Sequence, residues 1–285
     1  MKPRLCLGLA QFIFIASACA TASPPAPPQR TVASPSPSPS PSPSPLDVAS
    51  INDPGVLRDV LVSTELRIRL DETPPVEYEG LGRTQQAVYR KLVANPDWQA
   101  IAISGAPESL KEVIAGNIEA GGGLRALTKP VAKIPDWRIV VPPPPDELRA
   151  YYASAEQEFG IKWGYLASIH LVETRFGRIR GTSSAGAQGP MQFMPRTWAA
   201  YGKGDINDAR DSIMAAGRYL KAAGAPGDMH KALYAYNHSE RYVRAVTIYA
   251  EHMLALERNY LAYYHWQVYV RAESGDVLLE VGYGN

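Results

Sequence analysis

A strict Ser-Pro alternation from Ser34 to Pro45 limits where this chain can fold, and it closes a tract rich in Pro, Ser and Ala that begins at Thr21. Such a tract has little to bury and favours an extended polyproline conformation, a semi-rigid spacer of about 3 Å per residue. A Pro-rich ligand for a recognition domain is the alternative. The first 45 or so of the 285 residues therefore cannot join a packed core. The remainder has the length of one large domain, or of one domain with an extension.

The segment before this tract has the pattern of an export signal. Lys2 and Arg4 form a short basic start, and the apolar run 5–15 is too short to span a bilayer comfortably. Small residues then precede Cys19, as in a bacterial lipoprotein signal whose cysteine becomes the lipid-bearing N-terminus. We therefore expect residues 1–18 to be a signal peptide, although an ordinary cleavage site ending in Ala-Ser-Ala fits the same cut.

Cysteine usage bears on the choice between a lipid anchor and free secretion. The chain has 2 cysteines, and Cys6 would leave with the signal, so Cys19 would have no disulfide partner. A lone exported thiol is better explained as an acylation site, although a chance cysteine in the signal region stays open. We expect residues 19–45 to be a linker, lipid-anchored at Cys19, that holds the protein at the outer face of the membrane. Without the lipid the protein would be secreted.

The charge balance excludes one class of partner. Lys and Arg number 29 against 28 Asp and Glu, so no net field recruits nucleic acid or an anionic membrane surface. We expect no nucleic-acid partner, and contact with a membrane only through the N-terminal lipid.

Two folded units are expected after the linker. Residues 46–133 are predicted to be helical, and the helix that opens at Pro107 should stop at the three glycines 121–123. Nothing in this region indicates chemistry, so we predict an accessory region that packs on the second unit. The four prolines 142–145 cannot continue a helix, and they mark the entry to this second unit, residues 134–285.

The second unit is predicted to be helical with a small β-hairpin at its end. An apolar stripe from Leu148 to Phe159 ends at Gly160, as a surface helix would. The β-rich runs 266–271 and 277–281 flank a turn signal. Further helices are expected at 163–176, 190–201, 208–223, 229–236 and 239–257.

A carboxyl group ends the apolar face of one of these helices. Trp163, Leu166 and Glu173 share that face at helical spacing. A desolvated Glu has its pKa raised and can hold a proton near neutrality, as a general acid for a glycosidic oxygen must. Taken alone, the pattern fits equally well a core helix whose Glu173 pairs with a nearby arginine.

Three sequence blocks decide between these interpretations. They are Glu-Thr-Arg-Phe-Gly at 173–177, Ala-Gly-Ala-Gln-Gly-Pro-Met-Gln-Phe-Met-Pro at 185–195, and Tyr-Asn-His-Ser-Glu-Arg-Tyr-Val at 236–243. In this order they resemble the motifs of the lytic transglycosylases related to membrane-bound lytic murein transglycosylase B. The resemblance covers about residues 146–256. It implies a mainly α fold, with a lysozyme-like helical catalytic domain, an N-terminal helical extension and a small C-terminal β-hairpin.

The resemblance also implies an activity. This is cleavage of the β-1,4 bond between N-acetylmuramic acid and N-acetylglucosamine in peptidoglycan glycan strands, which leaves a 1,6-anhydromuramic end. By position, Glu173 matches the family's catalytic acid/base. The positions that match substrate-binding residues are Ser183 for the muramyl acetamido group, Gln192 near the cleavage point, and Tyr236, Asn237 and Tyr242 in the Tyr-Asn motif that lines the cleft.

The sequence after Glu173 agrees with a mechanism that uses one carboxylate. Ordinary glycosidases need two, yet the next Asp or Glu is Asp205, past the cleft-forming block. Glu173 would protonate the leaving oxygen while the substrate's acetamide stabilises the anomeric centre, and would then take the proton from the muramyl O6 as the anhydro ring closes. No cofactor is needed for this route. A hydrolytic muramidase of the same fold and a non-catalytic peptidoglycan-binding scaffold remain the alternatives.

The neighbours of Glu173 raise two further questions. Arg175, Arg178 and Arg180 would lower its pKa if they pointed inward, so we expect them at the surface or on the peptide stems of the substrate. His170 and Glu173 are spaced i, i+3 and could begin a metal site. With 5 scattered histidines and no mature cysteine pair, we expect no metal.

Overall fold

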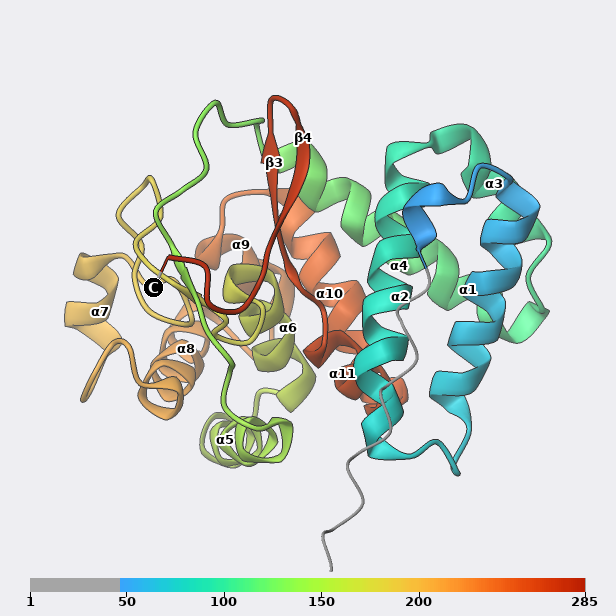
Figure 1. Cartoon of the computed structure of the whole chain (residues 1–285). Helices are drawn as coiled ribbons and strands as arrows, with labels where there is room; N and C mark the ends of the chain where they lie inside the picture. Colours follow the sequence, from blue (N-terminus) through green and yellow to red (C-terminus); the bar gives the residue numbers. More distant parts are fainter. Residues whose placement is uncertain (1–46, 285) are drawn as a thin grey trace, which may run out of the picture. The chain divides into compact units, whose positions relative to one another are not determined.

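The computed structural model describes residues 47–284, and this part of the chain is mostly helical with two small two-stranded sheets (Figure 1). The mainly α fold class is therefore confirmed. The predicted signal peptide 1–18, the linker 19–45 and the lipid site Cys19 lie outside the described residues. Between residues 47 and 284, the structure has no helix with both the length and the apolar character needed to cross a membrane.

The N-terminal part consists of four α-helices. Asp53 caps the first of them, because its Oδ1 accepts hydrogen bonds from the amides of Gly55 at 2.7 Å and Val56 at 2.9 Å. The helices are α1 (Pro54–Arg69), α2 (Tyr78–Ala94), α3 (Pro96–Ser104) and α4 (Glu108–Leu127), with short 3-10 turns at Val48–Ser50 and Pro75–Glu77.

Helix α4 runs through the three glycines 121–123, so the predicted stop was wrong. The helix continues because it lies against α10 (Glu240–Ala255), where its glycines allow a close approach. A Cβ on Gly116 would lie 2.9 Å from the His252 imidazole, and one on Gly123 would lie 3.6 Å from the Arg241 carbonyl oxygen. Gly116 thus serves helix packing, and the glycines 121–123 do not terminate α4.

The second part holds the other helices. They are α5 (Pro145–Phe159), α6 (Trp163–Thr174), α7 (Pro195–Tyr201), α8 (Ala209–Ala223), α9 (Met229–Tyr236), α10, and α11 (Glu257–Tyr264). Gly160, with φ +73°, ends α5 as predicted. The helix predicted at 190–201 begins only at Pro195, and α11 was not predicted.

Both sheets are antiparallel pairs. Strand β1 (Arg138–Ile139) pairs with β2 (Ile179–Arg180), which joins the connection before α5 to the segment after α6. Strand β3 (Val268–Ala272) pairs with β4 (Gly275–Leu279), which confirms the C-terminal hairpin.

One hydrophobic core joins the two parts. Leu57 and Ile114 of the N-terminal helices belong to the same buried cluster as Leu166 on α6 and Val246 on α10. Helix α10 packs against α4 on one side and α6 on the other, and α11 packs against α2 (Figure 1). The helices of residues 47–133 therefore pack on those of the second part, and α10 contacts helices of both.

Candidate active site

Helix α6 carries Glu173 through the interior of the protein. Its first amide, of Trp163, donates to the Glu156 carboxylate at 3.0 Å, which supplies the cap that Lys162 cannot. Nearly every side chain of α6 is buried, not only an apolar stripe, and the Ser168 hydroxyl donates to the Val246 carbonyl at 2.8 Å. The helix thus holds Glu173 in a fixed place.

Three successive residues in left-handed conformation end α6. Arg175 has φ 53°, Phe176 has φ 60° and Gly177 has φ 85°. Such angles are costly for residues with a side chain, so the surrounding structure must hold them. The Phe176 amide donates to the His170 carbonyl at 3.1 Å, and the Phe176 ring is fully buried. The chain therefore reverses directly after Glu173.

Thr174 ties this reversal to the loop after it, a role that the sequence did not reveal. Its hydroxyl accepts from the Gly177 amide at 3.0 Å and donates to the Pro190 carbonyl at 2.6 Å. Both bonds are buried, so they lock the loop against the end of α6. The only signal for this role is the place of Thr174 beside Glu173 in the first motif.

The Glu173 carboxyl is half-buried, and burial raises its pKa to about 7. One hydrogen bond opposes this shift, because the Tyr242 hydroxyl donates to Glu173 Oε1 at 2.7 Å and favours the charged form. No charged side chain in residues 47–284 contributes to this pKa shift. A carboxyl with this pKa populates both forms near neutrality, so it can donate a proton and later accept one.

Two tyrosines at the junction of α9 and α10 face this carboxyl. Tyr242 is buried in the first turn of α10, and Tyr236 ends α9. Their rings are parallel within 5°, with centroids 6.4 Å apart. Burial raises the pKa of both hydroxyls well above the usual range, so both stay neutral donors. The Tyr236 hydroxyl donates to the Met191 carbonyl at 2.6 Å, which fixes the loop that carries Gln192.

Gln192 lies in a tight turn, which explains why no helix starts at residue 190. It has φ 50°, and both its backbone amide (3.0 Å) and its Nε2 (2.9 Å) donate to the Gly189 carbonyl. On either side, Gln188 and Phe193 form an antiparallel bridge. Gly189 itself has φ 73°, and a Cβ there would lie 2.0 Å from the Ile206 carbonyl oxygen. Only glycine fits this position.

Ser183 and Asn237 lie at the edges of this arrangement. Ser183 and Ala187 close a small loop, because the Ser183 amide donates to the Ala187 carbonyl at 2.9 Å and the Ala187 amide donates to Ser183 Oγ at 3.0 Å. Asn237 follows α9 and is exposed. Glu173, Tyr242, Tyr236 and the Gln192 loop are thus linked by hydrogen bonds or stacking, whereas Ser183 and Asn237 are not part of that chain of contacts within residues 47–284.

The expectation that the three nearby arginines lie at the surface was wrong, because Arg175, Arg178 and Arg180 are all half-buried. The reversal after α6 turns Arg175 inward, where its Nη1 donates to the Leu171 carbonyl at 2.6 Å. Arg178 lies 5.4 Å from the centre of the Tyr264 ring and donates to the Tyr264 carbonyl. Arg180 donates to the Asn207 carbonyl at 2.8 Å. None of them contributes to the pKa of Glu173.

His170 serves the interior of the fold. It is fully buried, and its Nδ1 lies 2.7 Å from the Tyr152 hydroxyl. Burial lowers its pKa to about 3, so the imidazole is neutral at pH 7. No cluster of three or more possible metal ligands occurs among the described residues.

Residues 47–284 thus form a mostly helical domain in which α6 ends at a half-buried acid, Glu173, with a pKa of about 7. Residues 150–253 match the family model described as Transglycosylase SLT domain, a lysozyme-like domain. The match covers less than half of the 285-residue chain, and it indicates a domain similar to those of the lytic transglycosylases. The matched range contains Glu173 and the five expected substrate-binding residues, Ser183, Gln192, Tyr236, Asn237 and Tyr242.

A curated relative has a compatible name. The chain is 35% identical over 74 residues to "Membrane-bound lytic murein transglycosylase F" of Thiobacillus denitrificans. The aligned stretch covers 26% of this chain and 16% of that protein. The chain thus spans about a sixth of that relative's length, and the relative is of the F type rather than the B type of the sequence resemblance. No solved structure matched the chain.

Proposed function

We propose that this protein is a peptidoglycan lytic transglycosylase that cleaves the β-1,4 bond between N-acetylmuramic acid and N-acetylglucosamine and forms a 1,6-anhydromuramic end. One observation carries the proposal. Glu173 is an acid with a pKa of about 7 at the end of a buried helix, and its hydrogen-bond partner is the neutral Tyr242 phenol. A matching Transglycosylase SLT domain and a relative named for murein support the substrate class.

The first step needs Glu173 in its protonated form. Its proton passes to the glycosidic oxygen, the bond from that oxygen to the muramyl anomeric carbon breaks, and the substrate's acetamide oxygen bonds to that carbon. In the second step the ionised Glu173 takes the proton from the muramyl O6, which attacks the anomeric carbon and releases the acetamide. The carboxyl ends in its starting form, so one acid suffices where hydrolytic glycosidases use two.

Tyr242 positions this acid. Its bond to Glu173 Oε1 leaves Oε2 for the substrate, and the same bond stabilises the carboxylate that exists between the two steps. Ser183, Gln192, Tyr236 and Asn237 are proposed to bind the sugars, with Ser183 on the muramyl acetamido group and Gln192 near the cleaved bond.

The test is digestion of purified sacculi by the wild-type protein and by Glu173→Gln, with the products analysed by mass spectrometry. We expect anhydromuramic ends from the wild type. The variant should lose activity by about 10²- to 10⁴-fold, the usual contribution of a general acid/base. Reducing ends would indicate a hydrolytic muramidase, and intact glycan a binding scaffold. Full activity of the variant would contradict the mechanism.

We also propose that the protein acts outside the cytoplasm, anchored by a lipid on Cys19 after removal of residues 1–18. The basic start, the short apolar run and the small residues before Cys19 support this. Mass measurement of the mature N-terminus distinguishes the two forms. A diacylglyceryl cysteine supports the anchor, whereas an unmodified Cys19 would mean that the protein is secreted.

A further inference from the structure

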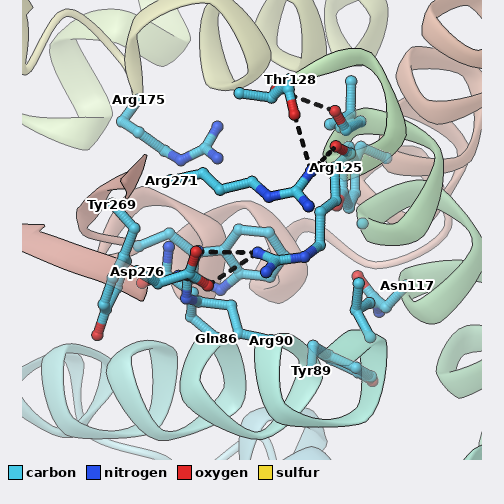
Figure 2. Close-up of a pocket in the computed structure, with 15 residues that line it drawn as sticks. Gln86, Tyr89, Arg90, Asn117, Arg125, Thr128, Arg175, Tyr269, Arg271 and Asp276 are labelled. Carbon is cyan, nitrogen blue, oxygen red and sulfur yellow. Dashed lines mark hydrogen bonds and ion pairs between the residues drawn. The ribbon is translucent and has the colours of Figure 1, made fainter. Parts of the chain in front are cut away.

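A cavity lined by four arginines lies between the N-terminal helices, the hairpin and the end of α6 (Figure 2). Its volume is about 150 Å³. The guanidinium groups come from four elements, and Asp276 on β4 is the one acidic residue among the described residues that line it. The four are Arg90 on α2, Arg125 on α4, Arg175 after α6, and Arg271 on β3.

The cavity lies apart from the catalytic acid, since Glu173 is not in its lining. The two share a wall, because Tyr249 lines the cavity from α10 and stands seven residues after Tyr242 on the same helix. Seven residues are about two turns, or roughly 10 Å along the helix axis.

The single carboxylate is shared by two of the arginines. Asp276 Oδ2 accepts from Arg90 at 2.6 Å, and both Asp276 oxygens accept from Arg125, at 3.0 and 2.8 Å. Arg271 instead donates to two carbonyl oxygens, of Arg125 at 3.3 Å and Thr128 at 2.9 Å. With four arginines and one aspartate, the lining carries three positive charges in excess.

Arg175 is the cation with least compensation. Its Nη1 bonds the Leu171 carbonyl, while its Nε is buried and has no hydrogen-bond partner among residues 47–284. Burial lowers the pKa of Arg175, although the guanidinium remains charged at pH 7. Withdrawing a cation from water without an anion nearby is costly, and a buried Nε without a hydrogen-bond partner adds to that cost. An anion from outside the chain would satisfy both.

We propose that this cavity binds a small oxyanion, a carboxylate or phosphate group, held by Arg175 and Arg271. The planar guanidinium fork matches the two oxygens of either group. Asp276 competes with the ligand, because it occupies Arg90 and Arg125. The rings of Tyr249 and Trp266, which also line the cavity, suit a ligand with a short carbon chain. The proposal does not depend on the proposed function.

The test is calorimetric titration of the full chain with sodium phosphate and, separately, with sodium glutarate, at an ionic strength fixed with sodium chloride. We expect one site per chain. Binding of phosphate alone would identify phosphate as the source, and binding of glutarate alone a carboxylate ligand. Arg271→Gln should weaken the binding at least tenfold, as expected for the loss of about 1.4 kcal/mol from a charge-assisted pair.

Two further variants separate ligand binding from damage to the fold. Asp276→Asn should tighten the binding several-fold, because it frees two guanidinium groups; loss of structure could only weaken it. Arg244→Gln, which breaks the exposed pair with Glu119, is the matched control and should leave the Kd unchanged. The proposal is wrong if neither phosphate nor glutarate binds to the protein. It is also wrong if the Asp276→Asn variant binds the ligand no more tightly than the wild type does.

Discussion

Glu173 and Tyr242 show which properties of a site residue can be predicted from the sequence and which depend on the fold. The sequence indicated Glu173 as an acid on an apolar face, and it placed Tyr242 in a motif by resemblance. It could not show that a Tyr242 hydroxyl, 69 positions further on, would donate to that carboxylate. Contacts between distant residues arise from tertiary packing, which has no periodic pattern in the sequence.

Removing the Tyr242 hydroxyl should change the pH dependence of the activity. Tyr242→Phe keeps the ring next to Tyr236 but deletes the bond that lowers the pKa of Glu173, so that pKa should rise further. The alkaline limb of the pH–rate profile should move to higher pH, with a rate loss of roughly tenfold from one charge-assisted hydrogen bond. Tyr234→Phe, on the exposed side of α9, is the control. An unmoved alkaline limb would mean that this bond does not set the pKa.

Glu173 should also make the fold less stable as the pH rises. Its pKa is about 7 in the folded protein against 4.5 ordinarily, so the folded state holds the proton more tightly. The resulting stability is fully present below pH 4.5 and is lost as the pH rises through 7, by up to about 3 kcal/mol. Urea unfolding of the wild type and of Glu173→Gln at pH 4.5 and 7.5 measures this contribution of Glu173 to the free energy of unfolding. The difference between the two proteins should change by this amount, and a constant difference would contradict the shifted pKa.

At the scale of elements, the helices were predicted well where apolar spacing and capping residues agreed. Helix α9 has the expected bounds, and α8 differs from the expected 208–223 only at Asp208, which caps the helix. The predictions failed where glycine had two possible roles. The glycines 121–123 lie inside α4, where a Cβ on Gly122 would meet nothing within 4 Å, whereas Gly189 has φ 73° in a turn outside any helix. Which role applies depends on the neighbouring element, and the sequence does not show that neighbour.

These two kinds of glycine should respond oppositely to alanine. Gly189→Ala places a Cβ against the Ile206 carbonyl at a left-handed φ, so it should cost about 2 kcal/mol or more and disturb the Gln192 turn. Gly122→Ala meets nothing within 4 Å in a helix and should add roughly 0.5–1 kcal/mol. Thermal unfolding of both variants tests this. Equal effects would refute the assigned roles.

At the scale of the whole molecule, the sequence suggested an accessory region followed by a catalytic unit, and the structure gives them one core. The Tyr263 hydroxyl of α11 donates to the Asn117 amide oxygen of α4 at 2.8 Å, in the interior. The boundary at residue 133 is thus a change in sequence character, and the helices before it support the wall formed by α10. Sequence composition alone could not reveal that shared core.

A chain that begins at residue 134 should therefore fail to fold. It would expose the face of α10 that α4 covers, along with the part of α11 that α2 covers. We expect it to bind a hydrophobic dye and to lose the cooperative thermal transition of the protein that includes residues 47–133. Near-ultraviolet circular dichroism of both proteins provides the measurement. A cooperative transition in the short chain would show that the second unit folds alone.

The shared wall also fixes the spacing of the motif that begins at Glu173. Glu173 meets Tyr242, while Arg175 lies beside Tyr249 two turns further along α10. Glu173 and Arg175, two residues apart in the sequence, thus contact residues that lie two helical turns apart on α10. Exchange of a side chain would disturb one contact, whereas insertion or deletion of a residue between 173 and 175 would change the spacing on which the two contacts together depend. In this segment, length is constrained more tightly than composition.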